Sequence, residues 1–161
     1  MGVEDFQVSI TYNGKSNEFN ELNQYLKSYQ NIIADYKTKQ ISNEHYYIFN
    51  DGKYIIEFEV YLKEMNLIKI SCRFAVCHPA SIDSLFEKLI MAIAKKLKAK
   101  IEILDETPNG DPYQFFYPNY DNFKKILRKA IEIKRNYWIQ DFGPKTLSLK
   151  TSDALKKYLL A

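Results

Sequence analysis

The most reactive side chains of this sequence gather between residues 72 and 78, where two cysteines, an arginine and a histidine lie close together. Cys77 and His78 stand just before a predicted helix, and a helix N-terminus favours the thiolate that makes a cysteine nucleophilic. Catalytic dyads, however, normally assemble from separate segments rather than from sequence neighbours. We therefore expect Cys72 and Cys77 to be packing residues, and an enzyme that uses Arg73, Cys77 and His78 stays open as an alternative.

The same residues raise the question of a metal site, because Cys72, Cys77 and His78 are zinc ligands by type. A structural zinc ion takes four protein ligands, and neighbouring residues on a strand point to opposite faces. The other histidine, His45, lies far away in the sequence. We expect neither a metal ion nor another cofactor.

A pair of carboxylates, Glu57 and Glu59, shares one face of a predicted strand and could perform general acid–base chemistry. The simpler interpretation is a solvated outer face, because an antiparallel sheet with one buried face shows polar residues on the other. The sequence contains no Gly-rich phosphate loop, no Gly-x-Ser-x-Gly elbow and no His-Glu-x-x-His motif. Enzymes that depend on those motifs are excluded, and we expect the chain not to be an enzyme.

The segment from Thr107 to Asn119 is long for a loop in a small domain, and such loops are usually functional or disordered. Aromatic side chains offer rigid contact area to a partner protein, and neighbouring carboxylates can set the register of binding. Some of the rings could instead tuck beneath the loop as a small additional core, and the sequence does not decide between the two. The candidate partner-binding residues are Asp105, Glu106, Asp111, Tyr113, Phe115, Phe116, Tyr117 and Tyr120.

Charge is distributed unevenly along the chain. Residues 1–64 hold 10 acidic and 6 basic side chains, whereas residues 65–161 hold 17 basic and 10 acidic ones. The last long predicted helix has a basic flank formed by Lys124, Lys125, Arg128, Lys129, Lys134 and Arg135. Such an asymmetry can steer a charged partner, although ordinary solvated helix faces produce it too. The pI of 8.6 and the absence of a known motif argue against a nucleic-acid module.

The elements that position these residues follow from hydrophobic periodicity. Strict alternation predicts strands, Asn50-Asp51-Gly52 predicts a hairpin turn, and apolar residues at steps of three and four predict helices. The predicted strands are 6–12, 46–49, 54–62, 68–77, 101–104 and 146–149, and the predicted helices are 17–37, 82–97, 121–139 and a short one after residue 151. Ser81 is expected to cap the second helix, with Asp83 in its first turn.

The turn near residues 63–67 must keep the apolar side chains on one face, since a slip of one residue would turn them all to solvent. This requirement pairs Leu62 with Ile68 and places Glu57 opposite Arg73 on the outer face. We therefore predict a single α+β domain over residues 1–161. Its largely antiparallel sheet has about five strands, with helices packed mainly on one face.

At 161 residues the chain has the size of one domain and can bury a core without metal or disulfide staples. No stretch approaches the roughly 20 apolar residues of a membrane span, and the first ten residues do not form the apolar block of a signal peptide. Two cysteines are too few for the disulfide framework of a secreted protein. We expect a cytoplasmic protein that does not bind membranes.

Residues 66–106 resemble a strand–helix–strand passage of the immunity proteins of bacterial polymorphic toxin systems. The likeness rests on an Arg-Phe-Ala strand end, a Cys-x-Pro step and a helix that begins near an aspartate. Here these are Arg73, Phe74, Ala75, Cys77, Pro79 and Asp83. The resemblance covers about a quarter of the chain, and it implies a non-enzymatic inhibitor that binds a cognate toxin domain, with no catalytic residue carried over. A generic adaptor, or a secretion chaperone that would be a dimer, is the alternative.

Overall fold

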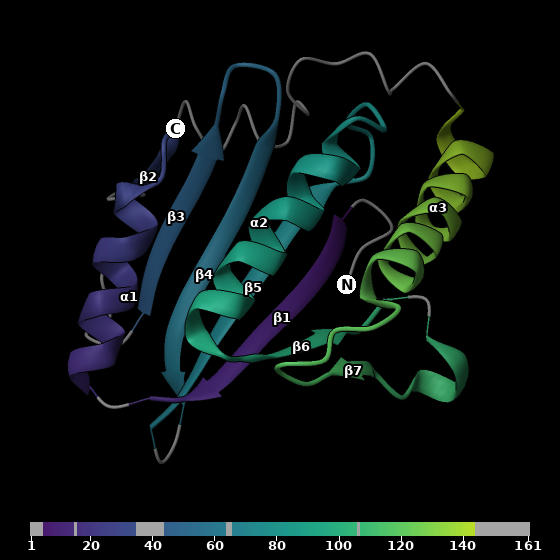
Figure 1. Cartoon of the computed structure of the whole chain (residues 1–161). Helices are drawn as coiled ribbons and strands as arrows, with labels where there is room; N and C mark the ends of the chain where they lie inside the picture. The colour runs from purple at the N-terminus through teal and green to yellow at the C-terminus, as the bar shows by residue number, and fades with distance from the viewer. Residues whose placement is uncertain (1–4, 15, 35–43, 64–65, 106, 144–161) are drawn as a thin grey trace.

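Seven strands and three long helices make up the part of the chain that the structure describes (Figure 1). The structure is a computed structural model, and it describes residues 5–14, 16–34, 44–63, 66–105 and 107–143. The strands are β1 (Asp5–Asn13), β2 (Ile32–Ala34), β3 (Glu44–Asn50), β4 (Ile55–Lys63), β5 (Leu67–Ala75), β6 (Lys100–Ile103) and β7 (Tyr113–Phe115). The helices are α1 (Ser16–Ser28), α2 (Ile82–Leu97) and α3 (Phe123–Phe142), with a short 3-10 turn at Pro108–Gly110.

All seven strands form one antiparallel sheet in the order β2-β3-β4-β5-β1-β6-β7. The predicted α+β class and antiparallel pairing are therefore confirmed. The predicted number of about five strands is wrong, because β2 and β7 hold only three residues each and are too short for alternation to reveal. The strand predicted at 146–149 and the short helix after residue 151 lie outside the described residues.

The centre of the sheet has the register that the sequence predicts. Leu62 pairs with Ile68 and Glu57 pairs with Arg73, and Nε of Arg73 lies 2.6 Å from Oε2 of Glu57. β1 inserts between β5 and β6. Because side chains alternate along each strand, one face of these strands is apolar and the other is polar.

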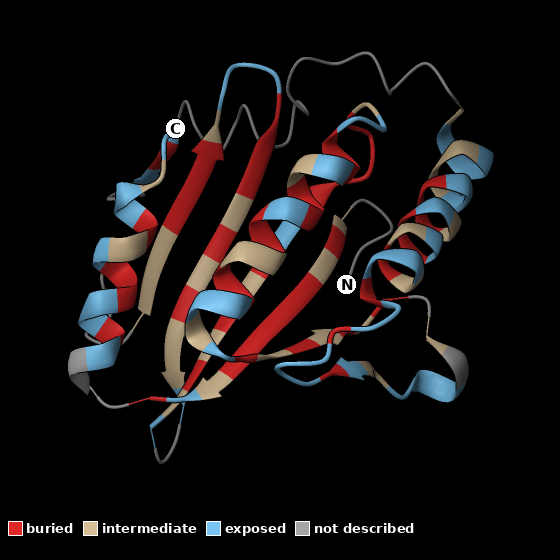
Figure 2. Cartoon of the chain, in the orientation of Figure 1, coloured by how far each residue is buried: buried red, intermediate tan, exposed pale blue. Residues whose placement is uncertain are grey.

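The apolar face of the sheet packs against the helices and forms one core (Figure 2). α2 lies across β4, β5 and β1, and its side chains Phe86, Ile90 and Ile93 are fully buried. α1 lies on the side of β2, and α3 packs against α2 (Figure 1). We predicted that the helices pack mainly on one face of the sheet. α2 does so, whereas α1 and α3 lie toward the two sides of the sheet (Figure 1).

Two predicted elements end earlier than the sequence indicated. The helix predicted over 17–37 ends at Ser28, because Asn31 adopts a positive φ of 67° and leads the chain into β2. Asparagine tolerates this left-handed conformation better than most residues do. The last three residues of that predicted helix lie outside the described residues. The strand predicted over 68–77 ends at Ala75, where the chain turns toward α2.

The start of α2 is held by tertiary contacts instead of the expected cap. Ser81 occupies the N-cap position, but its side chain makes no capping hydrogen bond and is bonded to the hydroxyl of Tyr54. Asp83 is buried and accepts two hydrogen bonds from Arg135 of α3, at 2.9 and 2.6 Å. The first turn of α2 is thereby tied to both the sheet and α3.

Candidate functional site

The aromatic segment divides into a buried part and an exposed part. Phe115 is 7% exposed, and its ring centroid lies 5.3 Å from that of Phe123 in α3. Tyr120 is also buried and donates a hydrogen bond to the backbone carbonyl of Ala99. The interpretation of a small additional core therefore holds for Phe115 and Tyr120, whose rings are not available to a partner.

The accessible side chains of this segment lie before, within and after β7. Phe116 is 59% exposed and Tyr117 is 43% exposed, while Asp111 is exposed and Tyr113 is half-buried. Side chains of this kind can contact a partner protein without opening the core. They stay candidates for partner binding, and Glu106 lies outside the described residues.

Asp105 serves the interior and not the surface. Its side chain is buried, Oδ1 accepts a hydrogen bond from Nζ of Lys134 at 2.9 Å, and Oδ2 accepts one from the backbone N–H of Gln7 at 2.9 Å. A buried carboxylate needs such partners, because desolvation of an ion costs several kcal/mol. Asp105 thus connects α3 to β1 and cannot reach a partner protein.

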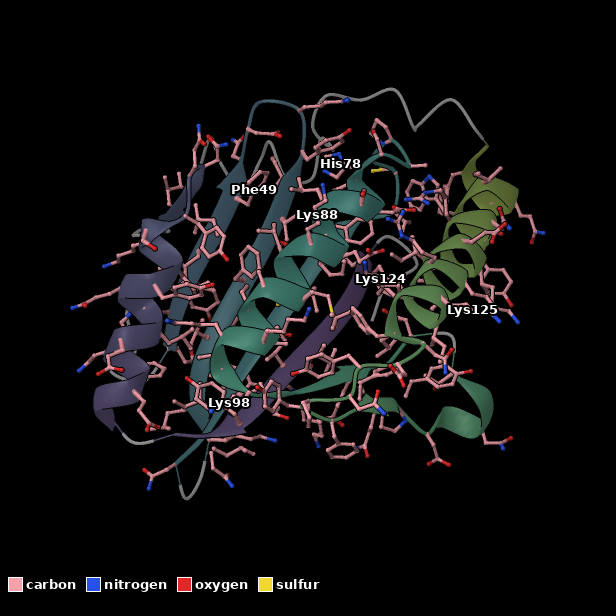
Figure 3. The ribbon with its side chains drawn as sticks, viewed as in Figure 1. Phe49, His78, Lys88, Lys98, Lys124 and Lys125 are labelled. Atoms are coloured by element: carbon pink, nitrogen blue, oxygen red, sulfur yellow. The ribbon has the colours of Figure 1, made fainter. Side chains whose placement is uncertain are left out.

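Most of the basic flank predicted on α3 is engaged inside the molecule. Lys134 and Arg135 are buried, and each pairs with a buried aspartate. Lys124 and Arg128 both reach Glu87 of α2, at 3.6 and 2.8 Å. Figure 3 shows Lys124 near the start of α3, on the side toward α2. These ion pairs hold α3 against the fold, so the flank does not form a continuous basic surface.

The structure separates Arg73 from the two residues with which it could have formed a reactive site. Arg73 pairs with Glu57 on the polar side of the sheet. Cys77 and His78 are buried in the connection between β5 and α2, where Figure 3 labels His78. Cys72 is buried in the core, and burial raises the pKa of its thiol. No disulfide joins the two cysteines.

His78 is an unusual buried polar side chain. It is 1% exposed, and neither ring nitrogen has a hydrogen-bond partner among the described residues. The ring of Tyr54 meets it edge-on with the centroids 6.1 Å apart. Burial lowers the pKa of His78, although the negative charge of Asp51 opposes that effect. The neutral imidazole is therefore the form expected at neutral pH.

The face of the sheet that points away from the core is the second candidate site, and we call it the polar face. Its polar residues are Gln7, Ser9 and Thr11 of β1, Glu44 and Tyr46 of β3, Glu57, Glu59, Tyr61 and Lys63 of β4, Lys69, Ser71 and Arg73 of β5, Lys100 and Glu102 of β6, and Gln114 of β7. The apolar Ile48 of β3 pairs with Glu57 on the same face. Alternation in the sequence predicted the outer faces of β4 and β5. It could not show that β1 pairs with β5, and β6 with β1, so that both strands continue the same surface.

Hydrogen bonds and ion pairs link neighbouring strands across most of the polar face. The pairs that join strands are Gln7 with Ser71, Tyr46 with Glu59, Arg73 with Glu57, and Glu102 with Gln114, while Lys100 pairs with Glu102 within β6. Burial and the nearby carboxylates raise the pKa of Tyr46 to about 12. Burial alone would raise the pKa of Glu102, but hydrogen bonds from Gln114 and Lys100 and the positive charges nearby lower it. Glu102 is therefore ionised and already paired.

Ser9 and Thr11 are the exceptions to this network. They are 1% and 9% exposed, and within the described part of the chain neither hydroxyl oxygen has a hydrogen-bond partner. A buried polar group without a partner costs about 1–3 kcal/mol, so it calls for an explanation. Both residues line a recess of about 390 Å³ on the polar face. The charged residues that line this recess are Lys63, Lys69, Lys100 and Glu102.

No family model, curated protein or solved structure matches this chain. Among the residues that the structure describes, no group of three or more His, Cys, Asp and Glu side chains is arranged to hold a metal ion. In the same residues, no helix is both long enough and apolar enough to cross a bilayer. The candidate sites are thus the polar face with its recess and the exposed side chains of the aromatic segment.

Proposed function

We propose that this chain is a non-enzymatic binding protein that docks another protein on its polar face, as an immunity protein binds its cognate toxin. The observation that carries the proposal is the recess, where two buried hydroxyls lack partners among the described residues and lysines outnumber carboxylates in the described lining. Polar groups that a fold leaves unsatisfied gain their partners when a complementary surface closes over them. In this proposal the helices cover the apolar face, and the polar face stays open for the partner.

The composition of the polar face supports a protein partner. Glu57 and Glu59 on β4 lie next to Lys69 and Arg73 on β5, so charges of both signs alternate over a few strand spacings. Mixed charge of this kind gives specificity and steers association, and non-obligate interfaces are about as polar as ordinary protein surface. The exposed ring of Phe116, two residues after Gln114, would extend this interface at the β7 edge with an aromatic anchor.

The resemblance of residues 66–106 to immunity proteins supports a protein partner and does not single out a face. Of the residues that carry the likeness, Arg73 lies on the polar face, whereas Phe74 and Cys77 are buried. A toxin-neutralising protein of this kind would act in the cytoplasm of the producing cell, before the toxin leaves it. A secretion chaperone would instead use an exposed face to form a dimer, and sedimentation of the purified chain separates the two ideas.

Affinity capture with quantitative mass spectrometry tests the proposal. The tagged chain, a polar-face variant (Lys69→Glu with Lys100→Glu) and a control variant on α3 (Lys125→Glu with Lys129→Glu) are incubated with a lysate of the producing cells. We expect one stoichiometric protein that is lost with the polar-face variant and kept with the control. Equal capture by all three baits would remove the polar face from the interface.

A growth assay then tests whether the captured protein is a toxin. Its C-terminal domain is expressed in a host that lacks this chain, with and without co-expression of the chain. We expect growth arrest that the wild-type chain relieves and the polar-face variant does not. A captured protein without any effect on growth would contradict the toxin assignment and favour a general adaptor.

A further inference from the structure

We infer that the recess on the polar face receives a carboxylate side chain from an acidic segment of the partner protein. The inference rests on the proposed function and specifies which chemical group the partner presents. It starts from the register of the sheet, which places Thr11 between Lys69 of β5 and Lys100 of β6. Ser9, two residues earlier, lies between Ser71 and Glu102.

The recess holds more hydrogen-bond donors than acceptors for them. Among the residues that the structure describes, Lys63, Lys69 and Lys100 contribute three ammonium groups to the recess, against the single carboxylate of Glu102. Glu102 is already bound to Lys100 at 3.0 Å and to Gln114 at 3.0 Å. The group that would complete the site is therefore an anion that only accepts hydrogen bonds, and an ionised carboxylate is such a group.

The two hydroxyls give the recess more than a general attraction for negative charge. Ser9 and Thr11 can each donate one hydrogen bond, and a carboxylate has two oxygens that accept several. Their oxygens are shielded from solvent, so an incoming group reaches them only when side chains that line the recess move. Lysine has a flexible four-carbon stem that permits this motion. A carboxylate that reaches the floor can accept hydrogen bonds from both hydroxyls.

The surroundings of the recess favour a protein carboxylate over a polyanion such as nucleic acid. Glu57 and Glu59 lie on β4, which pairs directly with β5. A long phosphodiester backbone laid along the sheet would run beside these carboxylates and be repelled, whereas a short acidic segment can place one side chain in the lysine-rich recess without extending over β4. A volume of about 390 Å³ also suits a side chain with part of its backbone.

Titration followed by amide chemical shifts in NMR tests the inference on the full chain. The probes are a tetraglutamate peptide, a tetraserine peptide as the uncharged control, inorganic phosphate and a single-stranded oligonucleotide. We expect tetraglutamate to shift the amides of Ser9, Thr11 and Lys69 in a saturable way, with weaker effects from phosphate. The shifts should shrink as salt rises, because screening weakens exposed charge pairs.

Matched variants locate the binding. Lys69→Gln and Lys100→Gln should each weaken tetraglutamate binding about tenfold, as expected for loss of one charge-assisted hydrogen bond. Lys125→Gln, an exposed lysine on α3, should leave binding unchanged. Equal weakening by all three variants, or saturable binding of only phosphate or only the oligonucleotide, would overturn the inference.

The inference and the proposed function fail in different ways. If the polar-face variant loses the captured protein while tetraglutamate never binds the recess, the partner docks without a carboxylate there. If tetraglutamate binds the recess and no protein is captured, the recess accepts carboxylates but the proposed function is wrong. Only capture together with recess binding supports both.

Discussion

Two groups of basic residues in this molecule have opposite environments. On α3, Lys134 and Arg135 are buried, and each is matched by an aspartate from another part of the fold. In the recess of the polar face, three lysines line a space with one glutamate, and two hydroxyls have no partner among the described residues. The basic charge of α3 is used to hold the fold together, whereas that of the recess exceeds what the fold requires.

The number of basic residues on an element does not by itself identify a binding surface. The flank on α3 looks like a binding surface in the sequence, yet its ion pairs join α3 to α2 and to the segment after β6. The lysines of the recess are dispersed in the sequence over three strands and come together only in the sheet. Breaking each group should therefore affect a different property, which is stability for α3 and binding for the recess.

The largest expected effect comes from the buried ion pair between Arg135 and Asp83. Arg135→Met should lower the free energy of unfolding by about 3–5 kcal/mol, because it leaves a buried carboxylate without its partner. Urea unfolding followed by circular dichroism measures this change. Lys125→Met, an exposed site on the same helix, is the control and should stay within about 0.5 kcal/mol. A loss below about 1 kcal/mol for Arg135→Met would show that this pair is not structural.

The next effect separates two adjacent rings of the aromatic segment. Phe115→Ala should lower the free energy of unfolding by about 3–4 kcal/mol, since its buried ring packs on Phe123. Phe116→Ala should change it by less than about 0.5 kcal/mol, because that ring is exposed. Thermal unfolding of both variants measures the difference. Equal losses would place Phe116 in the core and remove it from the proposed interface.

His78 should make stability depend on pH. Its folded pKa is lowered by burial, so the unfolded chain, with a histidine pKa of about 6.5, binds the proton more readily. The contribution is fully present above about pH 6.5 and is lost as pH falls below it, at no more than about 1.4 kcal/mol per pH unit for one proton. Urea midpoints at pH 7.5 and 5.5 measure the slope. His78→Phe should flatten it, and an unchanged slope would assign the dependence to other groups.

The smallest expected effect has the opposite sign. Ser9→Ala removes a buried hydroxyl without a partner and should raise the free energy of unfolding by about 0.5–1 kcal/mol. The same variant should weaken binding of the partner protein, because it removes a donor from the floor of the recess. Chemical unfolding measures the change in the free energy of unfolding, and a binding titration on the same preparation measures the change in Kd. A clear loss of stability would mean that the hydroxyl supports the fold itself.

Much of the fold could be predicted from local patterns, and the reasons are physical. Alternation and the requirement to keep apolar residues on one face determined the pairing of Leu62 with Ile68 and of Glu57 with Arg73. The three-residue strands β2 and β7 could not be predicted, since tertiary pairing and not local pattern defines them. The role of Ser81 at the start of α2 could not be predicted either, because its hydroxyl is bonded to Tyr54 and does not cap the helix.

The candidate site was predictable only in part. The sequence indicated a polar outer face on β4 and β5, and it identified Phe116 and Tyr117 as aromatic candidates that are exposed. It could not identify the recess, because Thr11, Lys69 and Lys100 are neighbours only through long-range strand pairing. The sequence also could not show that Asp105 is buried while Asp111 is exposed, since the burial of Asp105 depends on the position of α3.

The most direct test of the central claim is a calorimetric titration of the captured partner into the wild-type chain, Lys100→Gln and Lys125→Gln, with the urea midpoint of each recorded alongside. We expect Lys100→Gln to raise Kd about tenfold or more at an unchanged midpoint, while Lys125→Gln matches the wild type. Identical Kd values for all three proteins would contradict it, because the recess would then play no part in binding.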